Sequence, residues 1–88
     1  MFKVVLVCDG VPNNLGTQAA QDITEEFTHR PWQRHATCSW NGSSLVLEAE
    51  SETDLDGLGL MDEFSDAISS CIKEAFDGDI IVQRVSEI

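Results

Sequence analysis

A hairpin signal near the middle of the chain constrains the fold more than any other feature of the sequence. Residues 32–40 and 43–50 both alternate between two sets of side chains, and Asn41 and Gly42 stand between them. Asn-Gly favours a two-residue type I′ turn, because that turn needs positive φ at both central positions. Alternation on either side of such a turn predicts two antiparallel strands, over 32–40 and 43–50.

Two other segments have apolar residues three and four positions apart, as in a helix that buries one face. One begins near Leu15 and predicts a helix over 13–29, capped by an asparagine just before Leu15. The other includes Met61 and predicts a helix over 57–76, ended by Gly78.

The remaining apolar segments, 2–8 and 79–86, contain several β-branched residues and predict two more strands. The order strand, helix, strand, strand, helix, strand is the βαββαβ arrangement. Right-handed crossovers then give one antiparallel sheet with strand order 4-1-3-2 and both helices on one face. We therefore expect a single α+β domain over 1–88, a ferredoxin-like sandwich, with the apolar strands 2–8 and 43–50 at the centre of the sheet.

The charge of the chain narrows the range of its partners. Sixteen acidic and five basic residues give a net charge of −11, which argues against nucleic acid and anionic membrane surfaces because their phosphates would be repelled. No apolar run approaches the roughly 20 residues that a membrane-spanning helix needs. The charge is uneven, since residues 45–88 hold twelve acidic and two basic residues. A surface of this kind attracts basic proteins.

Carboxylates occupy every second position on and after the second hairpin strand. Four of them, Glu50, Glu52, Asp54 and Asp56, are predicted to steer a basic partner protein. The same stretch, with a glycine at the turn position and Glu63 at the end, has the oxygen spacing of an EF-hand calcium loop. The metal alternative uses Glu52, Asp54, Asp56 and Glu63 as ligands. It departs from the EF-hand pattern, because a glutamate stands at the first position and a strand precedes the loop.

The three cysteines, Cys8, Cys38 and Cys71, indicate reduced thiols packed in the core. Their number is odd and their spacing is wide, which is typical of a cytoplasmic protein without disulfides. No Cys-x-x-Cys pair is present, so we expect neither a metal–thiolate centre nor a redox cofactor. The expected location is the cytoplasm, and no cofactor is expected.

A two-residue turn at Asn41-Gly42 would place His35 opposite Glu48 on the sheet face away from the helices. A histidine beside a carboxylate can act as a general base. The hydroxyl groups of the hairpin do not lie in the sequence context of a nucleophile elbow, so no nucleophile is evident. We therefore expect no enzymatic activity, and a small enzyme of unknown reaction remains an alternative.

The sheet face away from the helices is the strongest candidate for an interface. By alternation it mixes apolar and polar side chains, which makes it too apolar for water and too polar for a second core. The predicted interface residues are Val5, Val7, His35, Thr37, Val46 and Glu48. We expect a small acidic interaction or regulatory module that forms a homodimer through this face and engages a basic partner protein. A divalent-cation binding domain is the alternative.

Overall fold

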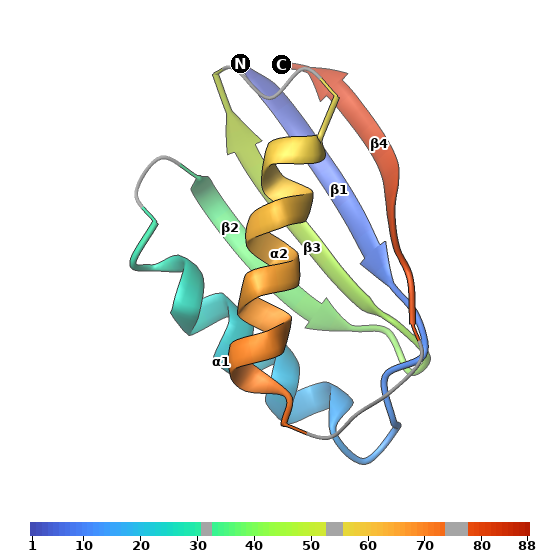
Figure 1. Cartoon of the computed structure of the whole chain (residues 1–88). Helices are drawn as coiled ribbons and strands as arrows, with labels where there is room; N and C mark the ends of the chain where they lie inside the picture. The colour runs from blue at the N-terminus through green and yellow to red at the C-terminus, as the bar shows by residue number, and fades with distance from the viewer. Residues whose placement is uncertain (31–32, 53–55, 74–77) are drawn as a thin grey trace.

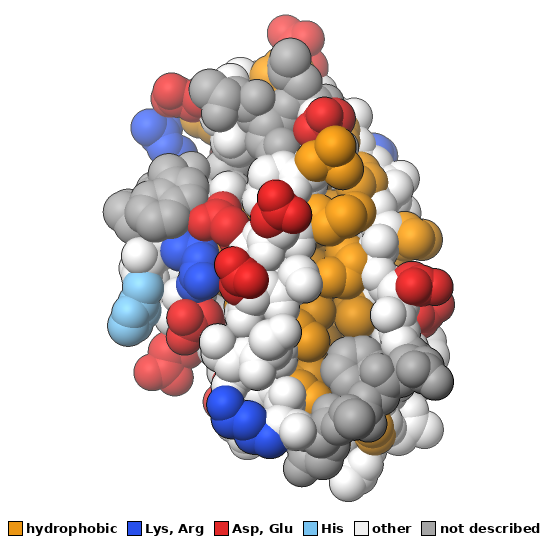
Figure 2. Space-filling model, in the orientation of Figure 1, with side chains coloured by type: hydrophobic (Ala, Val, Ile, Leu, Met, Phe, Trp, Pro, Cys, Tyr) orange, Lys and Arg blue, Asp and Glu red, His pale blue; other side chains and the backbone are white. Residues whose placement is uncertain are grey.

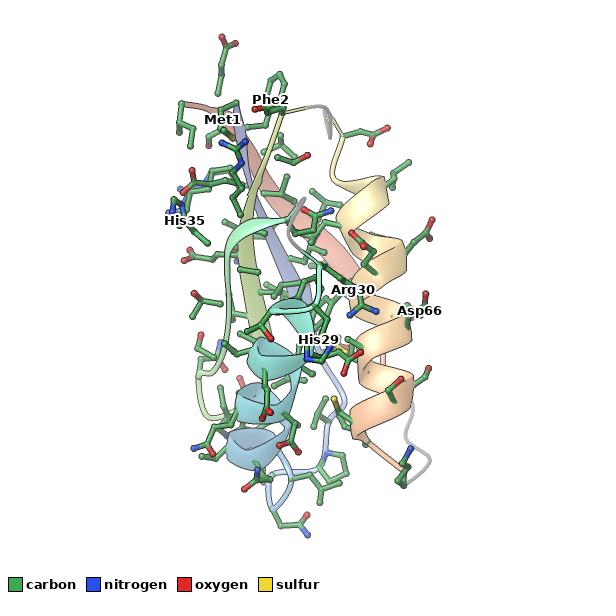
Figure 3. All side chains as sticks on the ribbon, turned by 90° about the vertical axis from the view of Figure 1, so that its left-hand side faces the viewer. Met1, Phe2, His29, Arg30, His35 and Asp66 are labelled. Carbon is green, nitrogen blue, oxygen red and sulfur yellow. The ribbon has the colours of Figure 1, made fainter. Side chains whose placement is uncertain are left out.

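The fold is an antiparallel sheet covered on one face by two helices (Figures 1 and 3). A computed structural model of the chain describes residues 1–30, 33–52, 56–73 and 78–88. Its elements in chain order are β1 (Phe2–Cys8), α1 (Gly16–Phe27), β2 (Arg34–Trp40), β3 (Leu45–Ser51), α2 (Leu58–Cys71) and β4 (Ile80–Glu87). The strand order is β2-β3-β1-β4, with all neighbours antiparallel. The ferredoxin-like βαββαβ prediction is therefore confirmed, including the strand order.

The hydrophobic core lies between the two central strands and the helices. Alternate residues of β1 and β3 point toward the helices and are at most 2% exposed: Val4, Leu6, Cys8, Leu45, Leu47 and Ala49. The helices contribute Ile23 and Phe27 from α1, and Leu60 and Phe64 from α2. These apolar strands occupy the centre of the sheet, as their composition predicts. Of the helices described, neither has the length and apolar character needed to cross a membrane.

Helix α1 is shorter than predicted, and its N-terminus differs. The N-cap is Leu15, and no side chain caps the helix there. A turn precedes it, in which the Leu15 N–H donates to the Pro12 carbonyl oxygen at 2.9 Å. The prediction of an asparagine cap is therefore wrong, because this turn places Leu15 at the position where the helix begins. The first helical residue, Gly16, lies against the indole ring of Trp40.

Helix α2 begins as predicted but ends earlier. Gly57 precedes it with a φ of +78°, and the Asp56 carboxylate accepts a hydrogen bond from the Leu58 N–H at 3.1 Å. The helix ends at Cys71, because Ile72 is extended and its side chain is buried. The prediction that the helix continues to residue 76 is wrong for this reason. Residues 74–76 of the predicted helix lie outside the described residues.

The β2–β3 hairpin is shifted from the predicted register by two residues. The flanking pair of the turn is Asn41 and Ser44, whose N–H and carbonyl oxygen are 3.1 Å apart. Gly42 therefore takes the first central position, and its φ is +100°. The Asn41 side-chain oxygen accepts hydrogen bonds from the N–H groups of Ser43 and Ser44. The predicted turn with Asn41 and Gly42 at its centre is wrong, because the Asn41 side chain accepts hydrogen bonds from the turn and its backbone does not adopt positive φ.

Each edge strand contains one irregularity in its pairing. In β2 the register shifts between Arg34 and Thr37, and His35 adopts a φ of +53°. In β4 the register shifts opposite Val5 and Leu6, which leaves Gln83 outside the pairing. A bulge adds one residue to a strand, so the side chains beyond it change face.

Candidate functional site

The open face of the sheet, away from the helices, is the candidate site (Figure 3). At one end, Val7 pairs in register with Val46 on one side and with Ile81 on the other. Val7 and Val46 are half-buried, and Ile81 is 57% exposed. We call Val46, Val7 and Ile81 the apolar row. It crosses three adjacent strands, so its side chains are neighbours on one surface.

Val5 was predicted to be an exposed member of this face, but it is only 3% exposed. Its partners in register are Glu48 and Arg84. The methylene stems of these two long side chains can cover a valine between them. At this end of the sheet the apolar surface of the open face is therefore the apolar row, and Thr37 lies opposite Glu48 at its polar side.

The charged side chains of the open face balance one another. Lys3 lies 4.0 Å from Glu48, and Arg34 lies 3.2 Å from Glu52, just past the end of β3. The remaining charged residues of this face are Arg84 and Glu50. On the paired strands and at Glu52, three basic and three acidic residues balance one another. Asp9 and Asp79, which continue the β1–β4 pairing beyond Cys8 and Ile80, add two exposed carboxylates at that end of the sheet.

The only histidine of the hairpin is placed differently from its prediction. His35 is exposed, and its Nδ1 atom lies 2.9 Å from a carboxylate oxygen of Glu50. The predicted pairing with Glu48 is wrong, because the hairpin register is shifted and Thr37 takes the position opposite Glu48. The pair lies at the surface of a strand.

The structure uses the predicted calcium ligands in other contacts. Glu52 pairs with Arg34, and the Asp56 carboxylate accepts the Leu58 N–H. Glu63 lies 3.5 Å from the Nε atom of Arg30. Asp54 lies outside the described residues. Within the described ranges, no group of three or more potential metal-ligating side chains is found. The metal site therefore stays a prediction.

The predicted steering carboxylates are distributed over the same contacts. Glu50 faces His35, Glu52 faces Arg34, and the Asp56 carboxylate accepts the Leu58 N–H at the start of α2. Two of these carboxylates therefore belong to the balanced open face. Exposed acidic residues that face no basic partner in the described contacts include Glu25, Asp62 and Asp66 on the helices, and Asp9, Asp79 and Glu87 near the strand ends.

A polar network that the alternation pattern did not predict joins the start of β2 to both helices. Regular alternation through His35 and Thr37 would place Gln33 on the open face, but Gln33 is 8% exposed and its amide donates to Glu63. Arg30 reaches Glu63 and also Glu26, at 3.3 Å. The bulge at His35 explains the difference, because it reverses the faces of the residues before it.

The exposed edge of β2 is partly closed by α1. The Thr24 hydroxyl accepts a hydrogen bond from the Cys38 N–H at 2.9 Å, and it lies 3.1 Å from the Cys38 carbonyl oxygen. These two backbone groups would otherwise be free to pair with another strand. A groove of about 520 Å³ follows this edge, and its lining includes Ala20, Thr24, Cys38 and Trp40. Strand addition at Cys38 is therefore blocked.

The three cysteines are free thiols, and their surroundings disfavour the thiolate. Burial, together with the nearby carboxylates of Asp9 and Asp79, raises the pKa of Cys8 from 9.0 to about 11. Burial likewise raises the pKa of Cys38 to about 12, and it raises the pKa of the half-buried Cys71. Nucleophilic chemistry by cysteine needs a lowered pKa, so these thiols are suited to packing.

Comparison of the chain with family models, with curated proteins and with solved structures gives no match. Sequence reasoning missed three members of the open face, Arg34, Ile81 and Arg84. Alternation along the last strand would have found Ile81, whereas Arg84 reaches this face only because of the bulge at Gln83.

Proposed function

We propose that this chain is a small non-enzymatic interaction module that forms a homodimer through the open face of its sheet. The observation that carries the proposal is the combination of the apolar row with a balanced set of charges. Two copies that each carry a net charge of −11 repel one another on most approaches. A face whose strand charges balance one another lowers the electrostatic cost of that approach.

The apolar row gives such a dimer its favourable contact. Ile81 is more than half exposed, and it would be buried together with Val7 and Val46 when two sheets pack face to face. In a two-fold symmetric dimer the same patch is used by both copies. Lys3 and Arg84 of one copy can then pair with carboxylates of the other copy around the row. Opposite charges at the rim fix the orientation of the partners.

Two further parts of the proposal concern partner and location. The exposed carboxylates on α1 and α2, such as Glu25, Asp62 and Asp66, support engagement of a basic partner protein. The three cysteines are unpaired, which supports a reducing compartment such as the cytoplasm.

Light scattering coupled to gel filtration, over a dilution series, tests the homodimer. We expect a mass of twice 9.7 kDa for the unaltered chain, and a monomer for Ile81→Glu and for Val46→Glu. The matched control is Leu58→Glu, which adds the same charge at a residue that is 54% exposed but lies on α2. A monomeric unaltered chain at high micromolar concentration would refute the proposal. So would a loss of the dimer in the Leu58→Glu control equal to that in Ile81→Glu.

A further inference from the structure

An apolar surface lies on the other side of the sheet, between α2 and β4. Figure 2 shows hydrophobic side chains in a continuous band beside α2, between this helix and the last strand. The residues of this apolar band are Leu58, Met61, Ile80, Val82 and Val85. Leu58 is 54% exposed, and the other four are partly buried at the margin of the core.

The apolar band exists because the two helices do not fully cover β4. Most helix-facing residues of β1 and β3, such as Val4, Leu6 and Leu47, are at most 2% exposed, whereas no residue of β4 is fully buried. Figure 1 shows α2 in front of the central strands, with β4 to one side. Glu63 and Cys71 mark the flank of α2 that faces α1. Met61 lies on the opposite flank at helical spacing, toward β4.

The frame of the apolar band is acidic. Exposed carboxylates lie on the outer face of α2, before its start and at both ends of β4: Asp56, Asp62, Asp66, Asp79 and Glu87. Lys73 is the one basic residue described near an end of α2. Arg84 of β4 lies on the open face and therefore does not border the apolar band. A second copy of this chain would bring a second acidic frame against the first. The complementary occupant is therefore apolar on one side and basic on the other.

The shape of the apolar band favours a helix as the occupant. The band follows α2, whose 14 residues span about 21 Å at 1.5 Å per residue. A helix beside α2 would place its apolar stripe on Val82 and Val85, as α2 does on the central strands. An extended peptide would instead pair with the outer edge of β4, where it would leave the apolar band uncovered.

We propose that the apolar band binds a cationic amphipathic helix of a partner protein, with its apolar stripe between α2 and β4 and its basic residues against Asp62 and Asp66. The site lies on the opposite side of the sheet from the proposed dimer face and does not depend on it. This proposal places the basic partner on the apolar band and its acidic border, in place of the four predicted steering carboxylates Glu50, Glu52, Asp54 and Asp56.

Three synthetic peptides, each as long as α2, test this binding by fluorescence anisotropy. The first contains only leucine and lysine, with leucines at i, i+3, i+4 and i+7. The second replaces every lysine by glutamate, and the third has the first composition with leucine and lysine strictly alternating. We expect binding of the first peptide, with a dissociation constant at least about tenfold lower than for either control. Equal binding of the first and third peptides would overturn the proposal, because charge alone would then explain it.

Two neutral variants identify the surface and separate this proposal from the dimer. Leu58→Gln/Met61→Gln should weaken binding of the first peptide about tenfold and leave the oligomeric state unchanged. Ile81→Gln on the open face should weaken the dimer and leave peptide binding unchanged. Asp62→Asn/Asp66→Asn should remove most of the dependence of binding on salt. Unaltered binding by Leu58→Gln/Met61→Gln, with the native circular dichroism spectrum retained, would overturn the proposal. Pelleting of the protein with phosphatidylcholine vesicles, lost in the same variant, would assign the apolar band to lipid instead and would also overturn it.

Discussion

Gly16→Ala should destabilise this protein, although glycine-to-alanine changes in helices usually have the opposite effect. Gly16 is the first residue of α1 and is buried. A methyl group at this position would lie closer than 3.0 Å to three carbon atoms of the Trp40 indole ring. These atoms belong to the fused part of the ring, so rotation of a flexible end group cannot remove the overlap. Either the indole or the first turn of α1 must move.

The size of the effect follows from two opposing contributions. Alanine in place of glycine favours a helix by at most about 1 kcal/mol, and by less at its first residue. Overpacking a filled site costs about 1–3 kcal/mol, and the overlap with Trp40 is severe. We expect a net loss of about 1–2 kcal/mol in the free energy of unfolding. At about 4–8 °C for each kcal/mol in a chain of this size, the melting temperature should fall by about 5–15 °C.

A double-mutant cycle with Trp40→Leu checks this reasoning. Thermal unfolding of the four proteins is followed by far-ultraviolet circular dichroism, and the unaltered chain and Gly16→Ala are also compared by tryptophan fluorescence. In the Trp40→Leu background the overlap is absent, so Gly16→Ala should be neutral or stabilising. An equal loss in both backgrounds would refute the steric explanation. A rise in the melting temperature of Gly16→Ala alone would refute it more directly.

Two other predictions concern the bulge in β2 and the buried thiols. His35→Gly should keep or raise the melting temperature, because glycine adopts the φ of +53° without strain. His35→Val should lower the melting temperature, because a β-branched residue is strained at this φ. Identical melting of both variants would contradict strain at this residue. In the folded chain the pKa of Cys8 is raised to about 11 and that of Cys38 to about 12. As the pH rises from 9.0 toward 11, the unfolded chain therefore releases these protons first, and the free energy of unfolding should fall. Urea titrations at several pH values measure the slope of the free energy of unfolding against pH, which is at most about 1.4 kcal/mol per pH unit for each thiol. An unchanged slope in Cys8→Ala/Cys38→Ala would show that other groups cause it.

The order and type of the elements could be predicted from the sequence because they depend on periodicity alone. Helix α1 buries Ala19, Ile23 and Phe27 at four-residue spacing, and β1 carries the longest apolar run of the four strands. A right-handed crossover then leaves one strand order for the sheet. The helix ends were less accurate, because they depend on single contacts. Ile72 leaves the helix to reach the core, and no periodicity signals that change.

The hairpin register was wrong because two turns compete for the same four residues. A type I′ turn over Asn41 and Gly42 and a turn over Gly42 and Ser43 both use the conformational freedom of Gly42. The second allows the Asn41 side chain to accept hydrogen bonds from two N–H groups. The difference shifts every pair by two residues. A shift of two keeps each side chain on its face, so the predicted core survived the error.

The balanced charge of the open face was beyond prediction for a related reason. Simple alternation places Arg34 with Cys38, and Arg84 with Val82, on the side of the helices. Each arginine is moved to the open face by a bulge in its own edge strand. Without these two bulges the open face would carry Lys3 against Glu48, Glu50 and Glu52 and would be acidic, and two arginines would point toward the core. The same irregularities therefore protect the core from buried charge and balance the strand charges of the open face.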